Sequence, residues 1–226
     1  MIIVKRCKLP LSKQKLLLNL FIAGCTARAA APIVSVNRET AKLFFRKLRK
    51  RLYDYHISES RKLNGIVEID ECYTSSGYGG RKAAKQGRNL SGKIAIVGAV
   101  ERKSKQLTLT RVFDTKESTL RKFAAGNVRQ GATVFTDAFR AYSRLRQDGF
   151  KHHKVNHFLT FKDSKTGACT NLIESFWASM RRHLYRFCGG HRHNLNFWLS
   201  ECALRFQFGA KFAHILKLAL KANTSF

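Results

Sequence analysis

The sequence predicts an α/β domain whose mixed sheet is flanked by helices, preceded by a small all-α region. Two observations carry this prediction. Helical periodicity recurs between residues 12 and 53, and a period-two pattern typical of strands begins at residue 66 and is followed by alternating strands and helices. The chain has 226 residues, of which 44% are hydrophobic and 11% aromatic, so it can bury a core of this kind.

The charge of the chain indicates a polyanionic partner. Lys and Arg number 43 against 14 Asp and Glu, which gives a formal net charge of +29. This imbalance argues against an enzyme for small neutral metabolites and favours a protein that binds nucleic acid. Net charge alone does not separate DNA from RNA, and a basic protein that only adheres to nucleic acid stays an alternative at this point.

The six cysteines make a metal site the less favoured interpretation, although several histidines lie near Cys169 and Cys188 in the sequence. They contain no CxxC pair and no Cys/His spacing of the zinc-finger type, so no zinc is expected. Reduced thiols in a cytoplasmic protein are the simpler interpretation.

The first predicted helix begins at a Ser12 cap and ends at Ala23 and Gly24. Its apolar positions are Leu16, Leu17, Leu20 and Phe21. Because basic residues precede this apolar run, an export signal is an alternative. The run is too short to span a bilayer, so no membrane partner is expected.

A basic helix follows in the arrangement of a helix-turn-helix. Thr26 can cap a short helix over 27–31, a connector containing Pro32 follows, and Asn37 can cap a helix from residue 38 to about Tyr53. A small bundle with a solvated basic face is the alternative. If the region binds DNA, its candidate contacts are Arg38, Lys42, Arg46 and Arg49.

The first predicted strand, over residues 66–73, carries three carboxylates. Glu68 and Asp70 share one face and Glu71 lies on the other. Carboxylates in so apolar a strand are costly unless they are paired or bind cations. The loop over 77–92 that follows is rich in Gly, Lys and Arg and is either disordered or in contact with a nucleic-acid backbone. Its candidate contacts are Lys82, Lys85 and Arg88.

The remaining elements complete a recognisable order. Strands over 93–101 and 106–113 form a hairpin, a helix runs to about residue 128, and a strand over 133–136 ends at Asp137. A helix from about residue 138, a strand near 154–157 and a helix from about Leu172 to Phe187 follow. Three strands, helix, strand, helix, strand, helix is the order of a ribonuclease-H-like fold.

Three acids occupy the positions that a two-metal phosphodiester site needs. Asp70 lies in the first strand, Asp137 ends the fourth, and Glu174 lies in the first turn of the later helix. Such sites hold two Mg²⁺ or Mn²⁺ ions with carboxylates. Each acid also has a structural interpretation. Glu174 could complete a capping box with Asn171, and Asp137 could cap the next helix. Asp70 could be an ion-paired strand residue, in which case Glu68, on the same face of the strand, would be the metal ligand.

Four segments then resemble the ISXO-type transposase domain of bacterial insertion sequences, a DDE transposase family. They are VEIDECY (67–73), VGAVER (97–102), TDAFRAY (136–142) and TNLIESFW (170–177). The resemblance covers residues 65–208 and implies a catalytic domain in which Asp70, Asp137 and Glu174 bind the metals. It also implies a role for Arg181 in positioning the DNA backbone, and Asn171 is an alternative ligand in related sequences.

The resemblance therefore predicts a DDE transposase. Such an enzyme cleaves DNA at the ends of an insertion sequence and transfers the strand into target DNA. Its expected partners are double-stranded element ends and target, with Arg182 as a further DNA contact and a homodimer or larger assembly on DNA. The expected location is the bacterial cytoplasm, at the nucleoid.

The expected organisation is a DNA-binding region over 1–60, the catalytic domain over 65–208 and a helical tail over 209–226. Longer relatives begin with a zinc ribbon, which this sequence does not contain. It is expected to be a short form, and a trimmed start is the alternative. Two alternatives stay open for the function. The first is a basic DNA-binding protein or inactive transposase remnant, and the second is a ribonuclease-H-like nuclease without strand transfer.

Overall fold

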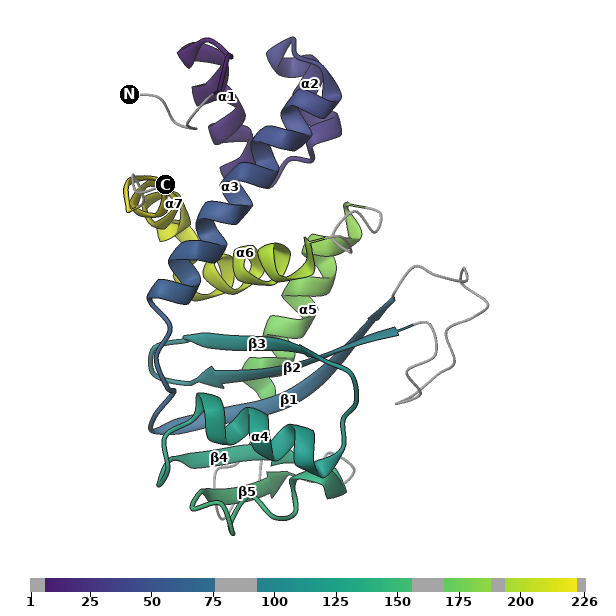
Figure 1. Cartoon of the computed structure of the whole chain (residues 1–226), viewed down its shortest axis with the longest axis vertical. Helices are drawn as coiled ribbons and strands as arrows, with labels where there is room; N and C mark the ends of the chain where they lie inside the picture. The colour runs from purple at the N-terminus through teal and green to yellow at the C-terminus, as the bar shows by residue number, and fades with distance from the viewer. Residues whose placement is uncertain (1–6, 76–92, 156–168, 188–193, 223–226) are drawn as a thin grey trace. The chain divides into compact units, whose positions relative to one another are not determined.

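The computed structural model describes residues 7–75, 93–155, 169–187 and 194–222 (Figure 1). The predicted contacts Lys82, Lys85 and Arg88 lie outside these ranges. The chain forms two compact units, one made of Met1–Glu59 with Arg182–Phe226 and the other of Ser60–Arg181. The catalytic domain was expected to run to residue 208. In the structure, residues 182–208 instead group with the N-terminal helices, because α6 packs against α3.

The first unit is helical. It contains α1 (Leu11–Ile22), α2 (Ala27–Val34), α3 (Arg38–Ser58), α6 (Leu195–Phe208) and α7 (Phe212–Lys221), together with the end of α5. Two predicted caps are confirmed. The Thr26 hydroxyl accepts a hydrogen bond from the Ala29 N–H, and the Asn37 side chain accepts one from the Glu39 N–H. The predicted Ser12 cap is wrong, because α1 already begins at Leu11, after Pro10.

The connection between α2 and α3 is shorter than expected. Pro32 lies inside α2, which continues to Val34, so only residues 35–37 join the two helices. Ser35 makes the turn with a left-handed backbone, at φ 52°. A three-residue turn between two packed helices fits the helix-turn-helix geometry better than the connector that was predicted.

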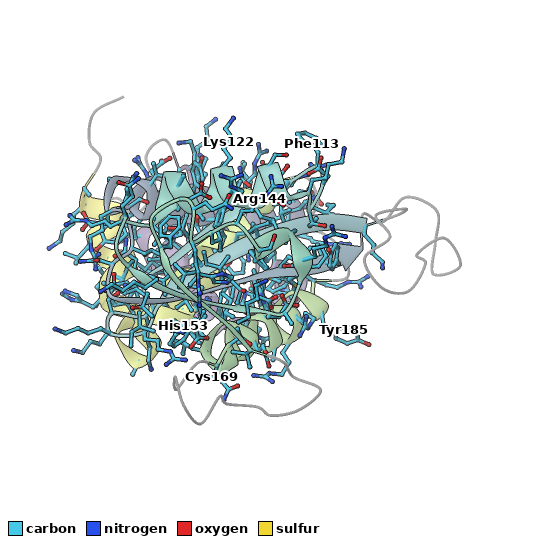
Figure 2. The ribbon with its side chains drawn as sticks, turned by 90° about the horizontal axis from the view of Figure 1, so that it is seen from below. Phe113, Lys122, Arg144, His153, Cys169 and Tyr185 are labelled. Carbon is cyan, nitrogen blue, oxygen red and sulfur yellow. The ribbon has the colours of Figure 1, made fainter. Side chains whose placement is uncertain are left out.

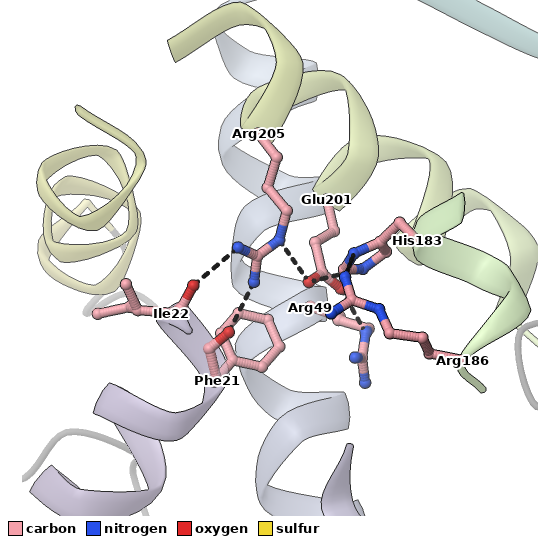
Figure 3. A network of polar contacts seen from close by, with 7 residues as sticks. All are labelled: Phe21, Ile22, Arg49, His183, Arg186, Glu201 and Arg205. Atoms are coloured by element: carbon pink, nitrogen blue, oxygen red, sulfur yellow. Dashed lines mark hydrogen bonds and ion pairs between the residues drawn. The ribbon is translucent and has the colours of Figure 1, made fainter. Parts of the chain in front are cut away.

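A buried carboxylate fastens three helices of this unit together (Figure 3). Glu201 on α6 is 1% exposed and accepts from Arg49 Nε at 2.6 Å and from Arg205 Nε at 2.8 Å. Arg205 also donates to the carbonyl oxygens of Phe21 and Ile22 at the end of α1. Arg49 is therefore an internal residue, 6% exposed, and the prediction that it contacts DNA is wrong.

The second unit is built on a five-stranded sheet. Its strands are β1 (Ile66–Ser75), β2 (Lys93–Glu101), β3 (Leu107–Val112), β4 (Thr133–Asp137) and β5 (Lys151–Val155), in the order β3-β2-β1-β4-β5. Strand β2 is antiparallel to both β1 and β3, and β4 and β5 run parallel to β1. This strand order and direction is ribonuclease-H-like, as predicted.

Helices cover both faces of this sheet. Helix α4 (Glu117–Asn127) connects β3 to β4 and packs on Val67, Ile69 and Val97 in one core (Figure 1). Helix α5 (Asn171–Tyr185) contacts the alternate residues of β1 and therefore lies on the opposite face. The helix predicted to start near residue 138 is instead a short 3₁₀ turn over Arg140–Tyr142. In the described part of the chain, no helix is long and apolar enough to cross a membrane.

Candidate functional site

Three carboxylates meet where β1 and β4 run side by side. The two strands pair in parallel through Glu68 and Phe135, and the same register two residues further on brings Asp70 level with Asp137. Oxygen atoms of Asp70, Asp137 and Glu71 lie within 4.8 Å of one another. The structure thus brings together two of the three predicted acids and adds Glu71.

Glu71 was missed because adjacent strand residues normally point to opposite faces. A buried tyrosine holds it in place, since the Tyr142 hydroxyl donates to Glu71 Oε2 at 2.7 Å. Burial, and next the negative charge of Glu71, raise the pKa of Tyr142 well above its ordinary value. The hydroxyl therefore keeps its proton and remains a donor to the carboxylate. The only sequence signal for Glu71 was its place as the third acid in an apolar strand.

Asp70 is a carboxylate in an unfavourable environment. Burial and then the charge of Glu71 raise its pKa to about 7, although the indole Nε1 of Trp177 donates to Asp70 Oδ2 at 3.0 Å. Gly98, the partner of Asp70 on β2, makes room for this indole. A Cβ atom at Gly98 would lie 2.7 Å from the Trp177 ring.

Asp137 has two roles. The Phe139 N–H donates to its Oδ1 at 2.9 Å, so the carboxylate caps the turn that follows β4. The capping interpretation is therefore correct in kind, although the turn leads into a 3₁₀ segment rather than an α-helix. The same side chain also belongs to the acidic cluster, so capping positions the carboxylate and does not exclude it from the site.

Glu68, the alternative ligand, serves the fold. Its Oε2 accepts from the backbone N–H groups of Leu172 and Ile173 at 2.9 and 3.0 Å, at the start of α5. Its Oε1 accepts from Arg102 Nε at 2.6 Å. Since Glu68 is 1% exposed and both its oxygens are engaged, the interpretation of Glu68 as a metal ligand is wrong.

Beyond its contact with Glu68, helix α5 continues alongside β1. Asp70 contacts Trp177, and Arg181 donates to the Cys72 sulfur at 3.3 Å. Two residues of a strand advance about 6.6 Å and four residues of a helix about 6 Å, so contacts at these spacings keep the helix beside the strand. Apart from this contact with Cys72, the Arg181 side chain is exposed.

Glu174 lies on the same stretch of α5 but outside the cluster. It is exposed, and its Oε1 accepts from the Thr170 hydroxyl at 2.6 Å. The side-chain partner of Glu174 is thus Thr170 and not Asn171, the exposed first residue of α5 with which the capping box was predicted. Within the described residues, Glu174 is not part of the group whose oxygens lie within 4.8 Å.

The helical unit carries a basic stripe on α3. Arg38, Lys42 and Arg46 are all exposed and are spaced by four residues, which places them on one face of the helix. Lys42 also forms an exposed ion pair with Glu39 at 3.2 Å. Arg182, on the part of α5 that belongs to this unit, is exposed as well.

The cluster fits a divalent cation. Mg²⁺ prefers carboxylate oxygens at 2.0–2.1 Å, so ligands on opposite sides of one ion stand about 4 Å apart. The spacing of the three carboxylates is compatible with this distance. A cation among them would also offset both causes of the raised Asp70 pKa.

A ribonuclease-H-like sheet with carboxylates gathered on its two central parallel strands defines an enzyme class that acts on phosphodiesters of nucleic acids. The comparisons are specific within that class. Residues 62–207, more than half of the chain, match the family model of the ISXO2-like transposase domain. The chain belongs to this family, which confirms the predicted DDE transposase function.

Individual relatives are distant. An uncharacterized transposase-like protein of Haemophilus influenzae is 32% identical over 95 residues, which cover 42% of this chain and 76% of the relative. The catalytic core domain of HTLV-2 integrase, in a structure with magnesium, matches with a TM-score of 0.38 and 11% identity over 65% of this chain and 87% of that one. An intasome structure of simian T-cell lymphotropic virus, in complex with the PP2A regulatory subunit B56 gamma, matches with a TM-score of 0.41 and 13% identity over 85% and 67%.

Proposed function

We propose that the protein cuts DNA at the ends of an insertion sequence and joins the freed strand to target DNA, with two divalent ions held at Asp70 and Asp137. The observation that carries this proposal is the meeting of Asp70, Glu71 and Asp137 in one place, in a chain of the ISXO2-like transposase family. Mg²⁺ and Mn²⁺ are the ions that fit such an all-oxygen site.

The chemistry consists of two in-line displacements at phosphorus. In the first, water attacks the phosphodiester at an element end, the P–O bond to the 3′ oxygen breaks, and a 3′-hydroxyl is released. In the second, that hydroxyl attacks a phosphodiester of the target, so one bond forms as another breaks. When bound, the two ions supply charge stabilisation at the phosphate and lower the pKa of the attacking group.

The residues around the ions position the carboxylates. The Trp177 N–H fixes the orientation of Asp70, and the Phe139 N–H fixes that of Asp137. Glu71, held by the Tyr142 hydroxyl, adds a third negative charge. These contacts preorganise the ligands before any ion binds.

Glu174 completes the ligand set in this proposal. It is carried by α5, the helix that also carries Trp177 and lies beside β1, so a change of its side-chain rotamer away from Thr170 would reorient the carboxylate. Asn171, the first residue of the same helix, is the alternative ligand. Arg181, which is exposed and two turns after Glu174, is proposed to contact the DNA backbone.

The DNA duplex would be bound mainly by phosphate contacts. The α3 stripe of Arg38, Lys42 and Arg46 and the exposed Arg182 supply positive charge. Lys82, Lys85 and Arg88, outside the described residues, are proposed as further contacts. Joining two element ends requires two active sites, so we propose a homodimer or larger assembly on DNA, acting at the bacterial nucleoid.

The test is cleavage of labelled element-end DNA in Mg²⁺ by wild type and by Asp137→Asn. Loss of a group that only orients a metal ligand lowers activity by roughly 10- to 100-fold, so loss of the ligand itself should lower nicking by at least about 100-fold. Asp148→Asn is the matched control. Asp148 pairs with Arg121 and precedes the start of β5, whereas Asp137 lies at the end of the neighbouring parallel strand β4. The two residues are therefore at opposite ends of the strands, and the Asp148→Asn protein should nick DNA at the wild-type rate.

The products separate the alternatives. Equal nicking by wild type and Asp137→Asn would contradict the proposed site. Nicking without joined product would indicate a nuclease, and binding without nicking by wild type would indicate an inactive DNA-binding remnant.

A further inference from the structure

A groove lies beside the acidic cluster, in the sheet unit. It has a volume of about 480 Å³ and is lined by residues 114–117, which connect β3 to α4, and by residues 139–141, which follow β4. The wall formed by residues 139–141 adjoins the acidic cluster, because the Phe139 N–H donates to the Asp137 carboxylate. The groove therefore opens next to one of the proposed metal ligands.

The strand register places the groove wall formed by residues 114–117 near the same end of the strands as the acidic cluster. Strand β3 runs parallel to β1 and ends at Val112, which pairs with Ala95 and through it lies level with Tyr73. The Tyr73 hydroxyl is 3.4 Å from the Thr115 hydroxyl in the groove wall. Phe113, the first residue beyond β3, directly precedes Asp114, the first residue of this groove wall.

Phe113 presents its ring to solvent. The residue is 89% exposed, and Figure 2 shows its side chain pointing away from the ribbon on the same side as Arg144. The Arg111 guanidinium lies 5.9 Å from the ring centroid, within the range of a cation–π contact. An aromatic ring beside a cation, with its remaining surface in solvent, is the kind of platform on which a nucleobase stacks.

The charges of the groove favour an anionic ligand. Lys116 and Arg140 line it. Its two acidic residues have partners within the protein, since Asp114 accepts from the Lys116 N–H and the Thr119 hydroxyl, and Glu117 pairs with Arg121 and Arg144. Asp114 keeps its negative charge, because both its donors are neutral. The positive charge in and beside the groove therefore comes from Lys116 and Arg140 together with the two arginines that pair with Glu117.

We propose that this groove binds single-stranded DNA next to the scissile phosphate, with one base stacked on Phe113 and the backbone beside Lys116 and Arg140. A transposase must hold the frayed or cleaved strand near its metal ligands between the two reactions. The groove has Asp114, the neighbour of Phe113, in one wall and Phe139, the donor to Asp137, in the other. The proposal rests on the proposed function only for the identity of the strand. Base stacking and phosphate contact are properties of the groove itself.

The experiment measures binding in EDTA, so that no DNA is cut. The probes are a fluorescently labelled duplex with a ten-nucleotide single-stranded 3′ overhang and a fully paired duplex of the same total length. A 2-aminopurine in the overhang reports stacking. Base stacking on an aromatic side chain is worth roughly 1–3 kcal/mol, which corresponds to about fivefold to 150-fold in affinity.

Phe113→Ala should weaken binding of the overhang DNA by that factor, leave binding of the paired duplex unchanged, and abolish the quenching of 2-aminopurine. Phe113→Trp should restore both signals. Tyr185→Ala removes another exposed aromatic ring, 86% exposed, and should bind both probes as wild type does. Lys116→Ala and Arg140→Ala should each reduce the log–log salt slope for the overhang by about 0.7, whereas Phe113→Ala should leave that slope unchanged.

Equal binding of the overhang by wild type and Phe113→Ala, or an equal loss for both probes, would overturn the proposal. The result is independent of catalysis. If wild type fails to nick element ends but Phe113→Ala still weakens overhang binding, the proposed function is contradicted and the proposed single-strand binding is supported. If wild type nicks element ends but Phe113→Ala binds the overhang as wild type does, only the proposed single-strand binding is contradicted.

Discussion

Asp70 shows how single residues tune the candidate site. Its carboxylate is buried beside Glu71, and a hydrogen bond from Trp177 is the contact that fixes it from α5. That indole reaches Asp70 only because residue 98 has no side chain. Gly98 therefore controls the geometry of the site without touching the ligand.

Gly98→Ala should impair cleavage more than it impairs folding. The new Cβ would overlap the buried Trp177 ring at 2.7 Å, so the indole must shift and its hydrogen bond to Asp70 is lost. Overpacking of this kind costs roughly 1–3 kcal/mol of stability. We expect the nicking rate to fall by about tenfold or more while the circular dichroism spectrum is retained.

Gly126→Ala is the control for this substitution. Its Cβ would meet no atom within 4 Å, and the position lies in α4. A Gly98→Ala protein that cuts as fast as Gly126→Ala would contradict the role given to Trp177.

At the scale of elements, sequence patterns located most of the structure. Strands β2 and β4 and the start of α3 lie close to where periodicity and capping residues placed them, because these signals are local. Long-range pairing was not accessible in the same way. Glu68 and Arg49 are both charged residues that sequence reasoning assigned to function, yet each is buried against a partner more than 30 residues away.

The candidate site was predictable in part for the same reason. Asp70 and Asp137 follow from strand order, since parallel neighbours place their corresponding ends together. Glu71 follows from no periodicity, because its position depends on the buried Tyr142 hydroxyl. The outward rotamer of Glu174 depends on Thr170, a contact that no spacing rule distinguishes from the Asn171 capping box.

The network on Glu201 is the principal polar contact between helices of the first unit. Glu201→Gln leaves the buried Arg49 without a counter-charge, and breaking a buried pair in this way costs about 3–5 kcal/mol. We expect a corresponding fall in the free energy of unfolding by urea. Asp54→Asn, which breaks the exposed pair with Lys50, should change it by less than about 1 kcal/mol.

This network also gives a pH dependence. Burial by itself raises the pKa of Glu201, but the charges of Arg49 and Arg205 and the His183 ring outweigh it, so the pKa is well below its ordinary value. Its stabilising contribution is therefore complete above about pH 4.5 and is lost as the pH falls below that value. The Glu201→Gln protein should lack this part of the acid destabilisation. An equal acid dependence in both proteins would show that the pair is not the cause.

At the scale of the whole molecule, the net charge of +29 is divided between internal and external uses. Arg49, Arg102 and Arg205 neutralise buried carboxylates. The α3 stripe and the cations of the groove remain at the surface. The arginines held in these internal pairs are not available to DNA, so the count of basic residues overstates the DNA-binding surface.

Replacing Arg38, Lys42 and Arg46 together by Ala should reduce the salt dependence of duplex binding. Each phosphate contact contributes about 0.9 to the log–log slope, so the slope should fall by about two to three. Lys50→Ala is the control on the same helix, because Lys50 is paired with Asp54 at 2.8 Å. An unchanged slope in the triple variant, measured by fluorescence anisotropy over a salt series, would place the DNA elsewhere.

The central claim is that Asp70 and Asp137 hold the catalytic divalent ions. The most direct measurement is anomalous diffraction from crystals soaked in Mn²⁺, with wild type compared with Asp137→Asn. The account predicts an anomalous peak within bonding distance of the Asp70 and Asp137 carboxylates in wild type, and its loss in the variant. Ordered Mn²⁺ at other carboxylates, with no peak at this cluster under saturating Mn²⁺, would contradict it.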